Sequence, residues 1–263
     1  MSTATQTAPR NTLPADGSRP GLARLARVEL RKAVDTRAGF WLAVVVALVS
    51  LAVVALQVFA GGDSAGDYAM WLVVQQTPVG FLVPVLAILV VTSEWSARTA
   101  VSTFALVPHR QRVLAAKLVA VLVLTVLAFA VSAALTALGT VLGSAVQDVP
   151  ADWDLQWWQV VQPFAVLAVS VLVGFALALL LLSSPVAIVL YFVVPTAFTI
   201  LFTFISALQD VGPWVDPFTA LAPVGTGVQM SGTDWAQVAT SSAIWVGLLS
   251  ALGALRVHRA EIT

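Results

Sequence analysis

Residues 38–60 read AGFWLAVVVALVSLAVVALQVFA and contain no charged side chain and no histidine. A helix needs about 20 apolar residues to cross the roughly 30 Å of hydrocarbon in a bilayer. The run follows a long basic segment and exceeds the roughly 7–15 apolar residues of a cleaved signal peptide. It therefore predicts a transmembrane helix.

Five further stretches are as long and as apolar. They lie near residues 70–92, 111–143, 160–182, 186–206 and 235–255. The stretch near 111–143 begins with a short basic segment, and its uncharged part starts at Leu118. Only Ser183, Ser184 and Pro185 separate two of the stretches, which predicts a tight hairpin turn. The sequence therefore predicts an all-α integral membrane protein with six transmembrane helices over residues 38–263.

The overall composition agrees with a membrane protein. Hydrophobic residues make up 59% of the 263 residues and charged residues 10%, compared with about 25% charged residues in soluble domains. This composition excludes a soluble globular enzyme and a disordered chain. The formal net charge is zero, so no basic field indicates nucleic acid as a partner. The chain has no cysteine, which excludes disulfides and thiolate metal sites.

The distribution of charge predicts the orientation in the membrane. All 13 basic residues lie within residues 10–37, 98–117 and 256–259, and six spans place these segments on one side. The positive-inside rule makes that side cytoplasmic, so both termini are expected in the cytoplasm and the chain in the cell membrane. The opposite side carries Asp63, Asp67, Asp148, Asp152, Asp154, Asp210, Asp216 and Asp234.

Three segments outside the spans have distinct patterns. Residues 1–20 are rich in Ser, Thr, Ala and Pro and predict a disordered tail. Residues 21–37 form an amphipathic pattern, with leucines and alanines on one side and arginines on the other, which predicts an interfacial helix. That helix is either an anchor for the first span or a docking surface for a cytoplasmic partner. Residues 207–234, with three prolines and several apolar side chains, predict short helices folded back onto the outer rim.

The connection between the second and third spans is the most informative segment. A short helix is expected over residues 96–106, and it ends at Val107 because a residue before proline avoids helical geometry. A new helix then begins at Pro108 or His109 and continues into the third span. The pattern predicts a short cytoplasmic helix held between two membrane helices, where it can transmit force.

Several chemistries have no candidate residues. The only histidines, His109 and His258, lie far apart in the sequence, which disfavours a histidine-based hydrolase or metal site. No Gly-Lys-Ser/Thr phosphate-binding loop is present, so ATP hydrolysis by this chain is not expected. The uncharged spans also disfavour an ion-coupled carrier. We expect a non-enzyme with no catalytic residue, metal or cofactor of its own.

These features together resemble the membrane permease of the type-two ATP-binding-cassette (ABC) exporters. The resemblance is carried by Glu94, Arg98, Thr99, Pro108, Arg110, Ala116 and Lys117, and by the Glu-Leu-Arg-Lys run that contains Glu29, Arg31 and Lys32. Many members of that family have glycine where this chain has Arg98. The resemblance covers the six-span topology, the N-terminal amphipathic helix and the short helix after the second span.

The resemblance implies a mechanism and partners. The 96–106 segment would be a coupling helix that docks on a separate cytoplasmic ABC ATPase subunit, which would bind ATP and Mg²⁺. Two permeases, identical or homologous, would form the path for a hydrophobic compound, drug, lipid or peptide. The expected coupling residues are Glu94, Arg98, Thr99, Phe104, Pro108, Arg110 and Lys117, where Phe104 belongs to a small apolar surface. The rival functions are a non-transport membrane anchor or regulatory subunit and, less favoured, an ion-coupled carrier.

Two polar clusters within the spans are candidates for a solute path between protomers. They are Gln75, Gln76 and Thr77 in the second span and Thr196, Thr199 and Thr203 in the fifth. The threonine spacing of three and four places these residues on one helix face. The alternative is hydrogen bonding between helices. A further pair, Gly139 and Gly143, permits close helix contact and suggests either dimerisation or a chance occurrence.

Overall fold

The computed structural model of the protein describes residues 21–96 and 110–259. This part of the chain is helical and contains six helices that are long and apolar enough to cross a membrane, which confirms the predicted all-helical, six-span class. The first five spans are α2 (Arg37–Ala60), α3 (Tyr68–Ser96), α5 (Arg110–Gln147), α6 (Trp157–Leu181) and α7 (Ser184–Phe204). The sixth combines α10 (Gly232–Ser242), the π-helical segment η4 (Ala243–Leu248) and α11 (Leu249–Arg259).

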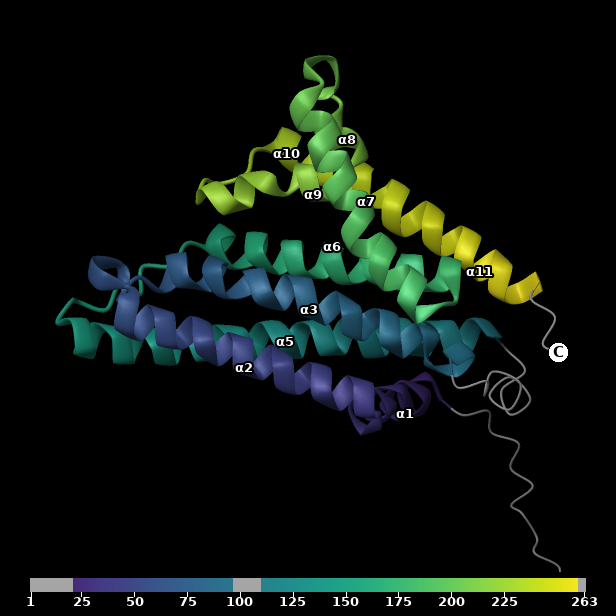
Figure 1. The fold of residues 1–263 in the computed structure, drawn as a ribbon, viewed down its shortest axis with the longest axis horizontal. Helices are drawn as coiled ribbons and strands as arrows, with labels where there is room; N and C mark the ends of the chain where they lie inside the picture. Colours follow the sequence, from purple (N-terminus) through teal and green to yellow (C-terminus); the bar gives the residue numbers. More distant parts are fainter. Residues whose placement is uncertain (1–20, 97–109, 260–263) are drawn as a thin grey trace, which may run out of the picture.

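The helices form one layer with a second group leaning away from it. Figure 1 shows α2, α3, α5 and α6 running alongside one another, while α7 and α11 diverge from them. Short elements lie in the connections that follow α2 and α7. They are η1 (Gly62–Ser64), η2 (Ser206–Leu208), α8 (Gly212–Val215), α9 (Pro217–Ala220) and η3 (Ala222–Thr226).

An N-terminal helix, α1 (Leu22–Asp35), lies at one end of the layer beside the end of α3 and the start of α5 (Figure 1). We call this the basic end, because the described lysines and arginines lie on α1 and at the adjoining helix ends; the opposite end is the acidic end. Thr36 has an extended backbone and separates α1 from α2, and its Oγ1 accepts a hydrogen bond from the Gly39 amide at 3.1 Å. A Cβ at Gly39 would lie 1.8 Å from the Ala33 carbonyl oxygen, so this sharp bend requires glycine.

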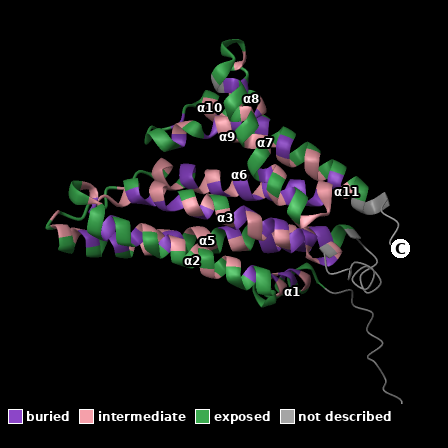
Figure 2. Cartoon of the chain, in the orientation of Figure 1, coloured by how far each residue is buried: buried purple, intermediate pink, exposed green. Residues whose placement is uncertain are grey.

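The apolar core lies between α3, α5 and α6, and α7 and η4 close one side of it. The side chains of Ile88, Val91, Leu167 and Val173 are at most 1% exposed. In Figure 2 the buried residues face the interior of this group, while exposed residues line the outer side of α2 and α7. Those outer residues are largely apolar, as expected for helices that face lipid.

The turn between α6 and α7 is as tight as the sequence predicts. Leu182 ends α6 in the left-handed conformation with φ 54°. α7 begins at Ser184 with Pro185 in its first turn, where a backbone N–H has no partner within the helix, so the N–H that proline lacks is not needed. The Ser184 hydroxyl lies 2.7 Å from the Thr92 hydroxyl, which ties this turn to α3.

The sixth span packs against α6 through a glycine. A Cβ at Gly253 would lie 2.7 Å from the backbone carbon of Leu179, so α11 approaches α6 more closely than any larger residue permits. The π-helical segment precedes this contact, and its Trp245 donates a hydrogen bond of 2.9 Å to the Val215 carbonyl oxygen. The sixth span thus contacts both α6 and the short helix α8.

One of the aspartates assigned to the acidic side is not at the surface. Asp216 belongs to the acidic side, but its side chain is fully buried. Its Oδ2 accepts hydrogen bonds from the backbone N–H and the hydroxyl of Thr219 and so caps the start of α9. This carboxylate therefore supports the local fold instead of facing water.

Candidate functional site: a buried charge network at the basic end

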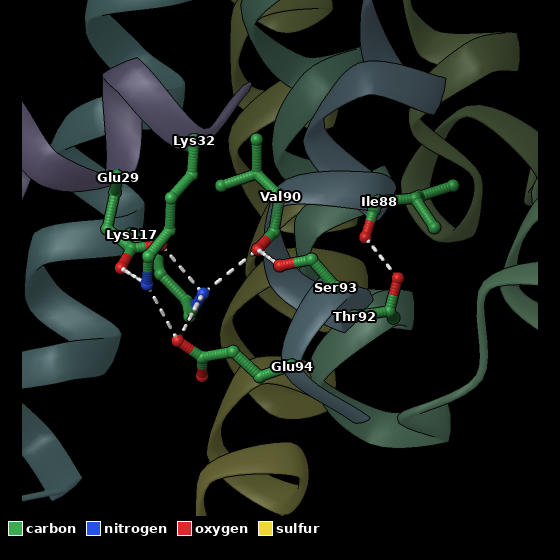
Figure 3. A network of polar contacts seen from close by, with 8 residues as sticks. All are labelled: Glu29, Lys32, Ile88, Val90, Thr92, Ser93, Glu94 and Lys117. Carbon is green, nitrogen blue, oxygen red and sulfur yellow. Dashed lines mark hydrogen bonds and ion pairs between the residues drawn. The ribbon is translucent and has the colours of Figure 1, made fainter. Parts of the chain in front are cut away.

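Four charged side chains from three helices meet at the basic end. They are Glu29 and Lys32 on α1, Glu94 on α3 and Lys117 on α5 (Figure 3). Lys117 Nζ lies 2.8 Å from Glu29 Oε2 and 3.5 Å from Glu94 Oε1. Lys32 Nζ lies 2.7 Å from Glu29 Oε1 and 3.1 Å from Glu94 Oε1. Each ammonium group therefore contacts both carboxylates, and we call these four residues the charge network.

The network is largely shielded from solvent. Lys117 is 0% exposed, Glu94 4% and Glu29 6%, while Lys32 is 40% exposed at the edge. Lys117 makes a third contact, a 2.9 Å hydrogen bond to the Val90 carbonyl oxygen. Removing a charge from water costs several kcal/mol unless it is paired and hydrogen-bonded. Two positive and two negative groups balance here, so the burial is tolerable only while all four are present.

The amphipathic pattern of α1 brings Glu29 into this buried position. Ala26 and Ala33 lie one turn before and one turn after Glu29 on the same side of the helix, and all three are buried. On α5, Ala116 and Ala120 beside Lys117 are also buried. These small side chains let α1 approach α5 closely. The buried side of α1 thus faces the bundle.

The partners fix the charge state of the α1 residues. Burial by itself raises the pKa of Glu29, but the ammonium groups of Lys117 and Lys32 outweigh it and lower the pKa below the ordinary value. Burial acts in the opposite direction on Lys32, and the Glu29 and Glu94 carboxylates outweigh it and raise the pKa of Lys32. Both groups therefore stay ionised around neutral pH.

The network flanks the segment that the sequence identifies as the coupling element. Glu94 lies near the end of α3 and Lys117 within two turns of the start of α5. Only Ser96 of the expected 96–106 helix is described, and it is the last residue of α3. The rest of that helix, with Arg98, Thr99 and Phe104, falls outside the described residues, and so do Pro108 and the 1–20 tail. The network nevertheless ties both helices that border residues 97–109 to α1.

The remaining described sequence candidates at this end are Arg31 and Arg110. Arg31 forms an exposed pair with Asp35 at 3.1 Å on the outward side of α1. Arg110 is the first residue of α5. The predicted interfacial residues thus divide, because Glu29 and Lys32 face the network and Arg31 faces outward.

The glutamine cluster of the second span is divided as well. Gln75 Nε2 donates to the Ser50 carbonyl oxygen on α2 at 3.4 Å, and Gln76 Nε2 donates to Ser132 Oγ on α5 at 2.6 Å. Both are hydrogen bonds between helices, which is the alternative to a solute path for these residues. Gln76 and the exposed Thr77 also line a hollow of about 310 Å³, so two of the three residues keep a place in a candidate solute site.

Thr196 and Thr199 of the fifth span do not line that hollow. Thr196 is exposed and donates to the Phe192 carbonyl oxygen one turn earlier. Thr199 lines a separate hollow of about 280 Å³ with Phe202, Gln209 and Thr219. The side chain of Thr203 lies outside the described part of the structure. Thr196 and Thr199 therefore share no hollow with the glutamine cluster among the described side chains.

Sequence reasoning missed two buried glutamines that organise the acidic end. Gln57 Nε2 donates to the Ala65 carbonyl oxygen and to Thr140 Oγ1, both at 3.1 Å, and Gly139 leaves room for the Gln57 amide. Gly143 packs against Ala65, so this glycine pair serves contacts within the chain. Gln162 accepts from the Met230 amide and donates to the Val228 carbonyl oxygen. The sequence signal for both Gln57 and Gln162 is a glutamine within an otherwise apolar stretch.

The described part of the chain offers no cluster of metal ligands. No group of three or more His, Cys, Asp or Glu side chains that could hold a metal ion occurs in residues 21–96 and 110–259. Neither a protein-family model nor a curated protein sequence matches this chain.

Proposed function

We propose that this chain is the membrane permease of an ATP-driven exporter and works with a separate ABC ATPase subunit that docks at the basic end. The observation that supports this proposal best is the charge network, which joins α1, α3 and α5 around residues 97–109. An amphipathic N-terminal helix, a polar connection after the second span and a six-span bundle are the parts that such a permease needs.

The proposed mechanism transmits motion through the network. The ATPase would press on the segment after α3, and the rigid pairing of Glu94 and Lys117 with α1 would pass that displacement to α3 and α5 together. Separating Lys117 from Glu29 or from Glu94 would leave a buried charge without its partner, which is costly. The three helix ends would therefore move as one unit. ATP and Mg²⁺ would be bound by the ATPase, and two permease copies in the cell membrane would alternate access for a hydrophobic solute, with their termini in the cytoplasm.

A non-transport membrane anchor is the competing function. An anchor needs a docking surface at the basic end but needs no hollow at the acidic end. The hollow beside Gln76, about 310 Å³ in volume, falls in the size range of small-molecule sites and therefore favours transport over anchoring.

Co-purification tests the proposed function. Tagged permease is purified from its native membranes, and the retained ATPase activity and subunit ratio are measured. Phe104→Asp should reduce ATPase retention because it places an unpaired charge in an apolar contact. Arg98→Glu should weaken retention more mildly and in a salt-dependent way.

Arg98→Lys is the matched control and should retain the ATPase, since it keeps the positive charge. Each variant must elute as folded protein in wild-type amount. If wild-type permease carries no ATPase, or if Phe104→Asp and Arg98→Glu both retain it fully and support ATP-dependent transport, the 96–106 segment is not the coupling element.

A further inference from the structure

A continuous groove lies at the acidic half of the bundle, between α3, α6 and the short helix η3. It consists of an inner hollow of about 310 Å³ and an outer hollow of about 390 Å³. Val73, Pro163, Val224 and Gly225 line both hollows, so the two adjoin. This groove is built within one protomer and needs no second copy.

The inner hollow is apolar and aromatic, and one of the residues that line it has a buried polar atom without a hydrogen-bond partner. Phe81, Tyr191 and Phe218 contribute rings to its lining. Gln76 also lines it, is 4% exposed, and its Oε1 has no hydrogen-bond partner among the described residues. An unpaired buried amide oxygen costs about 1–3 kcal/mol, so a ligand that donates a hydrogen bond here would recover that cost.

The orientation of the Gln76 amide follows from its neighbour. The Ser132 hydroxyl donates its single proton to the Phe129 carbonyl oxygen at 2.8 Å. Ser132 Oγ can therefore only accept from Gln76, which assigns the nearer amide atom as Nε2. The free atom is then the carbonyl oxygen, and it needs an N–H or O–H donor.

The outer hollow adds a negative charge and an indole ring. Asp67 and Trp158 both line it, at the starts of α3 and α6. Gln162, which also lines it, already uses both ends of its amide within the chain. The described lysines and arginines lie on α1 and at the helix ends of the basic end, and none of them lines this hollow beside Asp67. A carboxylate beside an aromatic face favours a positively charged group.

We infer that this groove binds a cationic amphiphile. Its ammonium-type group lies in the outer hollow near Asp67 and Trp158, and its apolar body fills the inner hollow. An N–H or O–H on that body donates to Gln76 Oε1. The inference rests on the proposed function only in making this ligand the transported solute, because binding itself needs neither ATPase nor ATP.

Equilibrium binding to the permease alone tests the site. The protein is placed in nanodiscs of zwitterionic lipid, and binding to empty nanodiscs is subtracted. Three probes are compared: rhodamine 6G, a cation with N–H donors; tetraphenylphosphonium, a cation without donors; and the anionic dye 1-anilinonaphthalene-8-sulfonate. Both cations should bind and compete with each other, and the anion should not displace them.

Two substitutions separate the two ends of the groove. Asp67→Asn keeps a side chain that can accept the Met70 amide and start α3, but removes the charge; it should weaken both cations about tenfold. Gln76→Met should weaken rhodamine 6G about three- to tenfold and leave tetraphenylphosphonium unchanged. Gln75→Met is the matched control, since Gln75 is equally buried but faces α2, and it should change neither affinity.

Gly80→Leu provides a variant that does not depend on a buried polar group. Gly80 lines the inner hollow, and a Cβ there meets no atom within 4 Å, so leucine can fill the hollow while α3 stays intact. Binding of both cations should be lost. Unchanged binding in Gly80→Leu and Asp67→Asn, or equal binding of the anion, would overturn the inference. Cation binding in this assay, together with failure of the wild-type chain to co-purify with an ATPase from native membranes, would support the groove and refute the exporter.

Discussion

Lys117 Nζ on α5 lies 2.8 Å from Glu29 Oε2 on α1, and the two residues are 88 positions apart in the sequence. The contact is almost completely buried, and it is the shortest link between α1 and the membrane helices within the network. It makes α1 a part of the bundle, and the stability of this helix therefore depends on a charge in the third span.

Removing that charge should destabilise the protein strongly. Lys117→Met keeps the length of the side chain but leaves the Glu29 and Glu94 carboxylates with only the partly exposed Lys32. Breaking a buried pair in this way costs about 3–5 kcal/mol. Thermal unfolding in detergent, followed by tryptophan fluorescence, should show a clearly lowered midpoint.

Arg31→Met is the control for that experiment. It also removes one cation that pairs with a carboxylate, but the Arg31 and Asp35 side chains are 82% and 61% exposed. Exposed pairs contribute little, so the midpoint should remain near the wild-type value. Equal midpoints for Lys117→Met and Arg31→Met would mean that the network does not stabilise the bundle.

The network should also shape the dependence of stability on pH. The pKa of Glu29 is lowered in the folded protein, so its contribution is complete above the ordinary glutamate pKa of about 4.3 and is lost as the pH falls through the lowered folded value. The pKa of Lys32 is raised, so its contribution is complete below about 10.4 and is lost as the pH rises through the raised value.

Thermal midpoints measured between pH 3 and 11 test this prediction. We expect a plateau with a fall at each end. Glu29→Gln should lower the plateau and flatten the acid fall, because the titrating group is gone. An acid fall of wild-type steepness in Glu29→Gln would assign it to other carboxylates.

The contact between α11 and α6 gives a third prediction. Gly253→Ala places a methyl group 2.7 Å from the Leu179 backbone, and the helices must separate to accept it. Overpacking of this kind costs about 1–3 kcal/mol. Gly247→Ala, in the same span, meets no atom within 4 Å and should be neutral. The yield of monodisperse protein and the unfolding midpoint are measured for both, and similar losses in the two variants would contradict a specific close contact.

The predicted orientation can be tested by cysteine labelling, since the chain has no native cysteine. Cysteines at Asp63 and Asp210, both exposed at the acidic end, should react with an impermeant thiol reagent on intact cells. Cysteines at Arg24 and Arg112, both exposed at the basic end, should react only after lysis. Labelling at residue 112 in intact cells would reverse the orientation.

The same assay distinguishes surface from buried residues at the acidic end. A cysteine at Asp216 should stay unlabelled until the protein is denatured, because the position is fully buried. It should also lower folded yield, since it removes the cap of α9.

The spans were predictable because the bilayer sets a length that few other structures need. The starts and ends of α2, α6 and α7 accordingly lie within three residues of the predicted ranges. The interior of the sixth span was not predictable, because the π-helical turn at residues 243–248 has no sequence signal of its own.

The charge network was predicted only in part. The amphipathic pattern predicts the interfacial helix that carries Glu29 and Lys32, and the family resemblance assigns Glu94 and Lys117 to coupling. An electrostatic contact to the N-terminal helix is one of two expectations for Glu94. Their meeting depends on how three helices cross, which no local pattern specifies. The burial of Asp216 did leave a signal, because an aspartate directly before a proline is typical of a helix start.

The order of synthesis gives Lys32 a role during folding in addition to its place in the charge network. Glu29 leaves the ribosome 88 residues before Lys117, which at about 5–20 residues per second is a delay of about 4–18 s. Throughout that interval the eventual buried partner does not exist. Lys32, one helical turn away and 2.7 Å from Glu29 in the finished protein, is available from the start. The nascent α1 thus contains a counterion for Glu29 before the third span has been synthesised.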